Sequence, residues 1–283
     1  CDGWSGSSLV LPRPQKSFQV PVLTPAGDTV QITFYPNDLK ALASSLWAKG
    51  FYEHSFVGGR CDQEKPKRDS SGRLTDADCF DINPTALHLL LINRLHLADK
   101  GFVMDANFDS EVWNHPVIGY DLVYFNPQTK ERSKNPRDVM IKYGTYTNDK
   151  FKKYRKKSVK SIIGVDVKIS YVTESSPRHL PTDSPENDNL TSVQYMYDLE
   201  IDQKDNIIGG EWYQNAHPDF IWAPKGNSKA VSSYEHYTVG DWDGNAPISK
   251  TWLPYVQRAS LNSQPFAKIV EKLFELSQEE GPE

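Results

Sequence analysis

The stretch that most constrains the fold runs from residue 101 to residue 123 and reads GFVMDANFDSEVWNHPVIGYDLV. Its apolar run 102–104 ends in Asp105, a pattern typical of a buried strand that delivers a carboxylate at its end. Pro116 biases the preceding residue toward an extended backbone. The segment EVWNHPVIGY is therefore predicted to be an extended ribbon rather than a helix, and Gly119 permits a bend in it.

The order of residues in this ribbon also predicts which side chains face the interior. Trp113 and Val117 are expected to face inward, whereas the polar Asn114 and His115 are expected to face solvent. Pro116 fixes the backbone at low entropic cost. The ribbon is therefore predicted to be an exposed, rigid recognition surface.

Length and charge set the limits on the class of protein. The chain has 283 residues, of which 38% are hydrophobic, which suits one large domain or two small ones. Its net charge of −5 gives no reason to expect nucleic acid as a partner. No apolar run approaches about 18 residues, so no membrane span is predicted. The chain begins with Cys and shows no signal peptide, which predicts that an N-terminal part of the full protein is missing.

Alternating and amphipathic patterns predict a mixture of strands and helices. Hairpins are predicted at 15–35 and 193–213, a strand at 161–172, and helices at 38–50, capped by Asn37, and at 265–280. Two polar stretches are predicted to be solvated, the loop 58–80 and the basic run 151–160. Nothing indicates a domain boundary, so the prediction is one α+β domain over residues 1–283 with a mostly antiparallel sheet.

Residues 83–101 permit two structures. Asn83 and Pro84 form a good helix start and Lys100-Gly101 a good stop, but LHLLLI also fits a buried strand. His88 lies in this run, where a satisfied core histidine is the ordinary role. If 86–93 and 102–105 are adjacent strands, His88 and Asp105 can pair.

Three cysteines form neither a disulfide framework nor a zinc site. Cys61 and Cys79 can bridge across about 18 residues, which would leave Cys1 as the odd thiol. A short helix is predicted at residues 3–11, and a thiol at the start of a helix gains nucleophilicity from the positive end of the backbone dipole. The alternative is an ordinary terminal cysteine.

Several segments together resemble one known family. VWNHPVIGYDLVY closely resembles the VWNQPV-G-[FY] segment of the transglutaminase elicitor family, secreted enzymes of plant-pathogenic oomycetes with relatives in bacteria. His115 stands where that family usually has Gln. Further segments also resemble the family, occur in its order and extend the resemblance over roughly residues 1–222. They are CDGWSGSS (1–8), DINPTALHLLLIN (81–93), FVMD (102–105), YDLEID and NIIGGEW (197–212), and HPDFIW (217–222).

The resemblance implies a papain/transglutaminase-like core and protein-glutamine γ-glutamyltransferase activity. Cys1 would attack the γ-carboxamide of Gln and pass the acyl group to a Lys amine or to water. His217, held by Pro218 between two tryptophans, and His88 are equal candidates for the general base. Asp105 or Asp219 would orient the imidazole, as the carboxylate of a catalytic triad does. For Asp219 the alternative is a local turn-capping role.

Other functions stay open at this point. The same residues suit a cysteine peptidase or amidase of papain-like type, and the chain could instead be a non-enzymatic secreted module recognised through its ribbon. The segment GDWDGNAP (240–247) resembles a Ca²⁺ loop but lacks the spacing and final Glu of an EF-hand, so no cofactor is predicted and a Ca²⁺ requirement stays open. The expected partners are protein substrates with Gln and Lys side chains, and the expected location is secreted or cell-surface associated.

Overall fold

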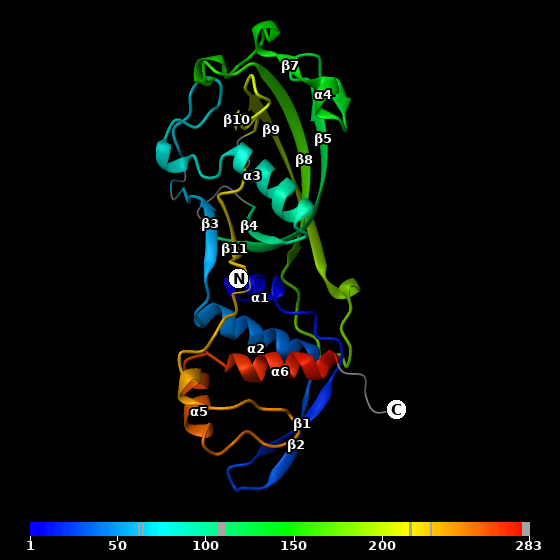
Figure 1. The fold of residues 1–283 in the computed structure, drawn as a ribbon, viewed down its shortest axis with the longest axis vertical. Helices are drawn as coiled ribbons and strands as arrows, with labels where there is room; N and C mark the ends of the chain where they lie inside the picture. The colour runs from blue at the N-terminus through cyan, green and yellow to red at the C-terminus, as the bar shows by residue number, and fades with distance from the viewer. Residues whose placement is uncertain (62, 64, 107–110, 215–216, 227, 279–283) are drawn as a thin grey trace. The chain divides into compact units, whose positions relative to one another are not determined.

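A computed structural model describes residues 1–61, 63, 65–106, 111–214, 217–226 and 228–278. Figure 1 shows its helices and strands. Contacts divide the chain into two compact units, each assembled from segments that are distant in sequence. The first unit comprises Cys1–Ser55, Thr173–Asn189 and Ala223–Glu283, and the second comprises Phe56–Val172 and Leu190–Trp222. The single domain over 1–283 stays a prediction.

The first unit is mainly helical. Its helices are α1 (Asp2–Ser8), α2 (Pro36–Lys49), α5 (Leu253–Leu261) and α6 (Ala267–Gln278), and its hairpin joins β1 (Phe18–Leu23) to β2 (Thr29–Phe34). The hairpin and the helices α2 and α6 confirm the predictions for 15–35, 38–50 and 265–280, whereas α5 was not predicted. Their apolar faces form one core, which includes Val20, Leu39, Leu46, Trp47, Trp252, Val270, Leu273 and Phe274.

Helix α2 begins at Pro36, so Asn37 is not its cap as predicted. The start is fixed by Asp38, whose carboxylate accepts a hydrogen bond from the backbone N–H of Tyr35 (2.8 Å). A side chain at the third helical position that reaches back to the residue before the helix satisfies a donor that the helix itself leaves unpaired.

A nine-stranded sheet dominates the second unit within the described part of the chain. Its main path runs β10-β9-β8-β5-β4-β11-β3, and β6 and β7 pair with β5 and β8. The pairings of β4 with β5 and β11, of β5 with β8 and of β9 with β10 are antiparallel, as predicted. The strands are β3 (His54–Gly58), β4 (Phe102–Asp105), β5 (Asn114–Phe125), β6 (Arg132–Ser133), β7 (Ile141–Lys142), β8 (Ser161–Thr173), β9 (Asn189–Ile201), β10 (Ile207–Gly209) and β11 (Phe220–Pro224).

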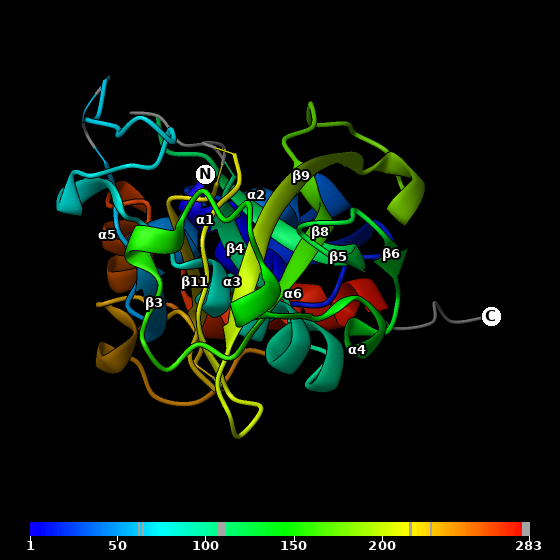
Figure 2. The same ribbon diagram turned by 90° about the horizontal axis from the view of Figure 1, so that it is seen from above.

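The long strands β8 and β9 lie side by side in both views (Figures 1 and 2). They carry several of the large apolar side chains that are fully buried in this unit. Among them are Ile162, Val165, Val167, Ile169, Tyr195 and Tyr197. Further short helices of the chain are α4 (Pro136–Val139) and the 3₁₀ turns Ala77–Cys79, Tyr143–Thr145, Lys152–Tyr154, Pro185–Asn187 and Glu235–Tyr237.

The ambiguous run after Asn83 is helical. Helix α3 spans Pro84–Leu90 and continues as a π-helix over Leu91–Leu97. Asn83 decides the structure, because its side chain accepts the backbone N–H of Thr85 (2.9 Å) and caps the helix start. The alternative of a strand over 86–93 is therefore wrong.

The ribbon is extended, as predicted, and Val117 faces inward, as predicted, but Trp113, Asn114 and His115 face the opposite way to the prediction. It forms the start of β5, where Asn114 and His115 are each 8% exposed, whereas Trp113 is 39% exposed. The reason is that β5 lies between β4 and β8, and the imidazole of His115 stacks on Tyr171 of β8 with 4.8 Å between ring centroids. The predicted bend is present as a register shift between Val117 and Gly119.

The prediction that the basic run 151–160 is solvated is only partly right. Most of its residues are exposed, but Arg155 is buried among carboxylates that come from distant segments. Within the described ranges, no helix has both the length and the apolar character needed to cross a bilayer.

Candidate functional site

Two buried carboxyl groups lie at neighbouring strand ends in the second unit. Strand β4 ends at Asp105, and Asp219 immediately precedes β11, which pairs with β4 through Ile221 and Met104. The backbone N–H of Asp219 donates to the carbonyl oxygen of Asp105 at 3.3 Å. Both side chains are 0% exposed, so the sheet brings two acidic residues together out of solvent.

His217 lies two residues before Asp219 in the chain. It is 2% exposed, and its ring stacks on the indole of Trp212 with centroids 5.4 Å apart and planes inclined by 19°. Burial lowers the pKa of His217 from 6.5 to about 4, so its imidazole is neutral at neutral pH. The Nδ1 atom lies 3.2 Å from the carbonyl oxygen of Pro218.

Trp212 owes its position to two glycines in the GGEW segment. A Cβ atom on Gly210 would lie 2.1 Å from the backbone oxygen of Asp198, and one on Gly209 would lie 2.7 Å from a carboxylate oxygen of Glu200. At Gly210, where the clash is with the backbone, only glycine allows this approach of the segment to β9. The Trp212 indole N–H then donates to the carbonyl oxygen of Ile82 at 3.0 Å.

His88 has a different environment. It lies on α3, is 4% exposed, and its Nδ1 is 3.0 Å from the hydroxyl of Tyr197. Burial lowers the pKa of His88 to about 4 as well. Because His88 is on a helix, the predicted pairing of adjacent strands that would have joined it to Asp105 does not exist.

Cys1 belongs to the first unit, whereas His88, Asp105, His217 and Asp219 belong to the second. It is the N-cap residue of α1 and an exposed free thiol. The helix runs over Asp2–Ser8, which is shorter than the predicted 3–11 because the N–H of Leu9 bonds back to Gly6 and closes the last turn. Gly3 fixes α1 on α2, since a Cβ there would lie 2.1 Å from the backbone oxygen of Ser44.

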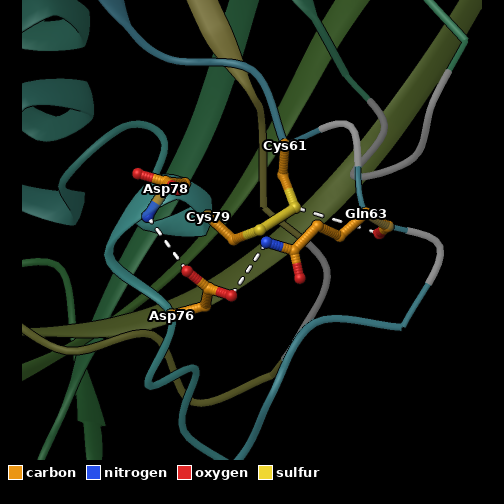
Figure 3. Close-up of a disulfide and its surroundings, with 5 residues drawn as sticks. All are labelled: Cys61, Gln63, Asp76, Asp78 and Cys79. Carbon is orange, nitrogen blue, oxygen red and sulfur yellow. Dashed lines mark hydrogen bonds between the residues drawn. A yellow bond between two sulfur atoms is a disulfide. The ribbon is translucent and has the colours of Figure 1, made fainter.

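The other two cysteines form a disulfide, the bridge that the sequence allowed. Cys61 and Cys79 are joined with an S–S distance of 1.99 Å (Figure 3). Beside them, the carboxylate of Asp76 accepts hydrogen bonds from the side chain of Gln63 (2.8 Å) and from the backbone N–H of Asp78 (3.4 Å). Cys1 is therefore left as the odd thiol.

Sequence reasoning missed some residues of the site. Asn114 is opposite Asp105 in the β4–β5 register, and its side-chain oxygen accepts the indole N–H of Trp222 at 2.7 Å. Tyr195 donates its hydroxyl to the carbonyl oxygen of Ala106, just beyond Asp105 (2.6 Å). Only the strand register reveals these contacts, because the partners are about 90–110 positions apart in the chain.

Over the residues that the structure describes, no group of three or more His, Cys, Asp or Glu side chains is placed to hold a metal ion. In the segment 240–247, the carboxylate of Asp243 accepts the backbone N–H of Asn245 (2.9 Å), which is the bond of a local turn.

Comparison with known proteins gives one family and one solved structure. The family model described as "Transglutaminase elicitor" matches residues 1–236. The structure is similar to the crystal structure of the GP42 transglutaminase from Phytophthora sojae, with 22% sequence identity and a TM-score of 0.52. The alignment covers 92% of this chain but 62% of that one, so this chain spans less than two thirds of its length. The likeness extends to the mixed fold of helices and a curled antiparallel sheet. The comparison with curated proteins gives no match.

Proposed function

The chain belongs to the transglutaminase elicitor family, and we propose that it is a protein-glutamine γ-glutamyltransferase with a cysteine nucleophile. The membership confirms the resemblance found in the sequence. The observation that carries the proposal is the state of His217, a neutral imidazole stacked on Trp212 and followed by the fully buried Asp219. Such a group can accept a proton at neutral pH in a place that water does not reach.

The proposed reaction begins with proton transfer from the Cys1 thiol to the imidazole of His217. The thiolate attacks the carbonyl carbon of the Gln γ-carboxamide, and the C–N bond then breaks as the imidazolium returns its proton to the leaving ammonia. The product of this half-reaction is a thioester on Cys1. A Lys amine, or water, attacks the thioester, and the thiol is regenerated.

We assign the base to His217 rather than His88 on the basis of their partners. The nitrogen of His88 lies within hydrogen-bond distance of the Tyr197 hydroxyl, and its ring meets Tyr124 and Tyr197 edge-on, which is typical of a structural histidine in a core. His217 instead stacks on the indole of Trp212 and lies two residues before the fully buried Asp219. Asp105 and Asp219 both remain candidates for the carboxylate that stabilises the imidazolium.

The surroundings support transfer and an extracellular setting. Trp212 covers one face of His217 and would help to keep water from the thioester. The disulfide between Cys61 and Cys79 is typical of proteins in an oxidising compartment, which agrees with a secreted or cell-surface protein. The papain-like character of the core and the Gln and Lys substrates belong to the same proposal.

The test is incorporation of a labelled primary amine into a Gln-rich protein, run with the full chain and with Cys1→Ala, each with and without Ca²⁺. We expect incorporation by the unmodified protein and none by the variant, while circular dichroism shows the same fold for both. Incorporation by Cys1→Ala at the unmodified rate would refute the assignment of the nucleophile. Peptide-bond cleavage without incorporation would favour the peptidase alternative.

A further inference from the structure

Arg155 is buried within the otherwise exposed basic run 151–160. Its side chain is 1% exposed, and its guanidinium makes five hydrogen bonds. Two go to Asp149 (2.9 and 3.0 Å), two to Asp198 (2.7 and 2.6 Å) and one to Glu200 (3.2 Å). A guanidinium has five N–H donors in a fixed fork, so all of its donors are used.

Asp198 connects this charge cluster to the GGEW segment. The same Oδ1 atom that accepts from Arg155 also accepts the backbone N–H of Glu211 (3.1 Å). The backbone N–H of Asp198 in turn donates to the carbonyl oxygen of Glu211 (3.0 Å). Gly210 meets the Asp198 backbone so closely that no side chain fits between them. The guanidinium therefore fixes the carboxylate that holds Glu211.

Glu211 is held from its other side by Arg73, which comes from the loop closed by the disulfide. The Arg73 guanidinium donates to both carboxylate oxygens of Glu211, at 2.7 and 3.2 Å. The next residue is Trp212. Its indole N–H donates a hydrogen bond to the carbonyl oxygen of Ile82, and its ring stacks on the imidazole of His217. The hydrogen bonds from Arg155 thus reach Trp212 through two intermediates, Asp198 and Glu211.

We propose that Arg155 is a positioning residue for His217, because its fork of hydrogen bonds holds the Asp198–Glu211 contact that seats Trp212 beneath the imidazole. The expected effect of Arg155 on catalysis rests on the proposed function, whereas its effect on the position of Trp212 does not. Lysine carries the same charge on a single nitrogen with three donors, so it cannot make five bonds to three carboxylates. The geometry of the guanidinium, rather than its charge alone, is what the arrangement requires.

The informative variant is therefore Arg155→Lys, with Lys157→Met as the control, since Lys157 is an exposed cation of the same run. The imidazole signals of His217 and His88 are followed by NMR between about pH 3.5 and pH 8, and the His217 signal is assigned with His217→Gln. In the unmodified protein both histidines should titrate near pH 4. In Arg155→Lys we expect His217 alone to titrate at least one pH unit higher, because it loses the cover of Trp212. His88 serves as the internal reference.

Amine incorporation by Arg155→Lys should fall at least tenfold, and Lys157→Met should match the unmodified protein in both measurements. The inference is overturned if His217 titrates in Arg155→Lys as it does in the unmodified protein, or if His88 shifts equally. If Arg155→Lys does not fold, Asp198→Asn decides the question, with the same selective shift of His217 expected. Absence of incorporation by the unmodified protein would refute the proposed function, whereas the NMR result tests the positioning role by itself.

Discussion

Trp212 and His217 form a nearly parallel stack, with ring centroids 5.4 Å apart and planes inclined by 19°. The stack removes one face of the imidazole from water and so contributes to the burial that lowers the pKa of His217 to about 4. A base with a low pKa is mostly unprotonated at neutral pH but takes up a proton less readily. The stack therefore favours the neutral form of His217 and also makes its imidazole a weaker base.

The two buried histidines should respond differently to substitution. His217→Gln is expected to lower amine incorporation by orders of magnitude, because an activated nucleophile requires its base. His88→Gln should keep most of the activity and lose about 1–3 kcal/mol of stability through its Tyr197 partner. Initial rates of incorporation and urea unfolding of both variants check this. Equal, mild losses in both would contradict a Cys–His mechanism with His217 as the base.

Stability should decrease in acid because of the same histidines. For each, the pKa is about 4 in the folded chain and 6.5 without burial, so the unfolded chain binds more protons between these values. Stability is therefore lost as the pH falls from about 6.5 to about 4, by up to about 3 kcal/mol per histidine. Urea midpoints across this range should fall less steeply for His88→Gln than for the unmodified protein. Parallel pH profiles would show that His88 is not buried in its neutral form.

Asp81 should have the opposite pH dependence. Burial raises its pKa to about 6, and neither carboxylate oxygen finds a hydrogen-bond partner within the described residues. Because the folded pKa lies above the unfolded value, the charged form destabilises the fold above about pH 6, and stability is gained as the pH falls through that value.

The variant Asp81→Asn should therefore be more stable near pH 7.5, by about 1 kcal/mol for a partly solvated group, and should gain less near pH 5. Asn also tolerates the left-handed backbone of this position (φ 43°). Thermal unfolding at the two pH values tests the prediction. A destabilised variant at pH 7.5 would mean that the carboxylate is bound by a partner.

The disulfide should contribute to stability. It closes a loop of 18 residues, for which chain entropy gives a stabilisation of about 3 kcal/mol. The double variant C61A/C79A should unfold at a correspondingly lower urea concentration, while its folded form still incorporates amine above the level of Cys1→Ala. Loss of incorporation in a double variant that remains folded would point to a role of these cysteines beyond stability.

Local patterns predicted much of the fold. The β1–β2 hairpin, strand β8 and helix α6 follow from alternation or from an amphipathic period, which need only neighbouring residues. His115 was assigned to the wrong face because β5 is enclosed by β4 and β8, and polar character alone does not reveal that enclosure. Asn83 contained the decisive signal for α3, but the apolar run that follows it fitted a strand equally well.

The site was less predictable because its contacts join distant segments. Arg155 is 43 positions from Asp198, so the run around it read as an ordinary solvated face. The motif residues Cys1, Asp105, His217 and Asp219 could be named from the sequence, but their environments could not. The same burial lowers the pKa of both His88 and His217, and only their partners distinguish them.

The proposed function depends above all on acylation of Cys1 by a Gln side chain. The most direct measurement is mass spectrometry of the full chain quenched in acid during reaction with a Gln-containing peptide, with the adduct then located by proteolysis. We expect a thioester at Cys1 that carries the mass of the peptide minus ammonia. It should accumulate in the absence of an amine and disappear when a primary amine is added. Ammonia release without an adduct at Cys1, or with the adduct on another residue, would contradict acylation of Cys1.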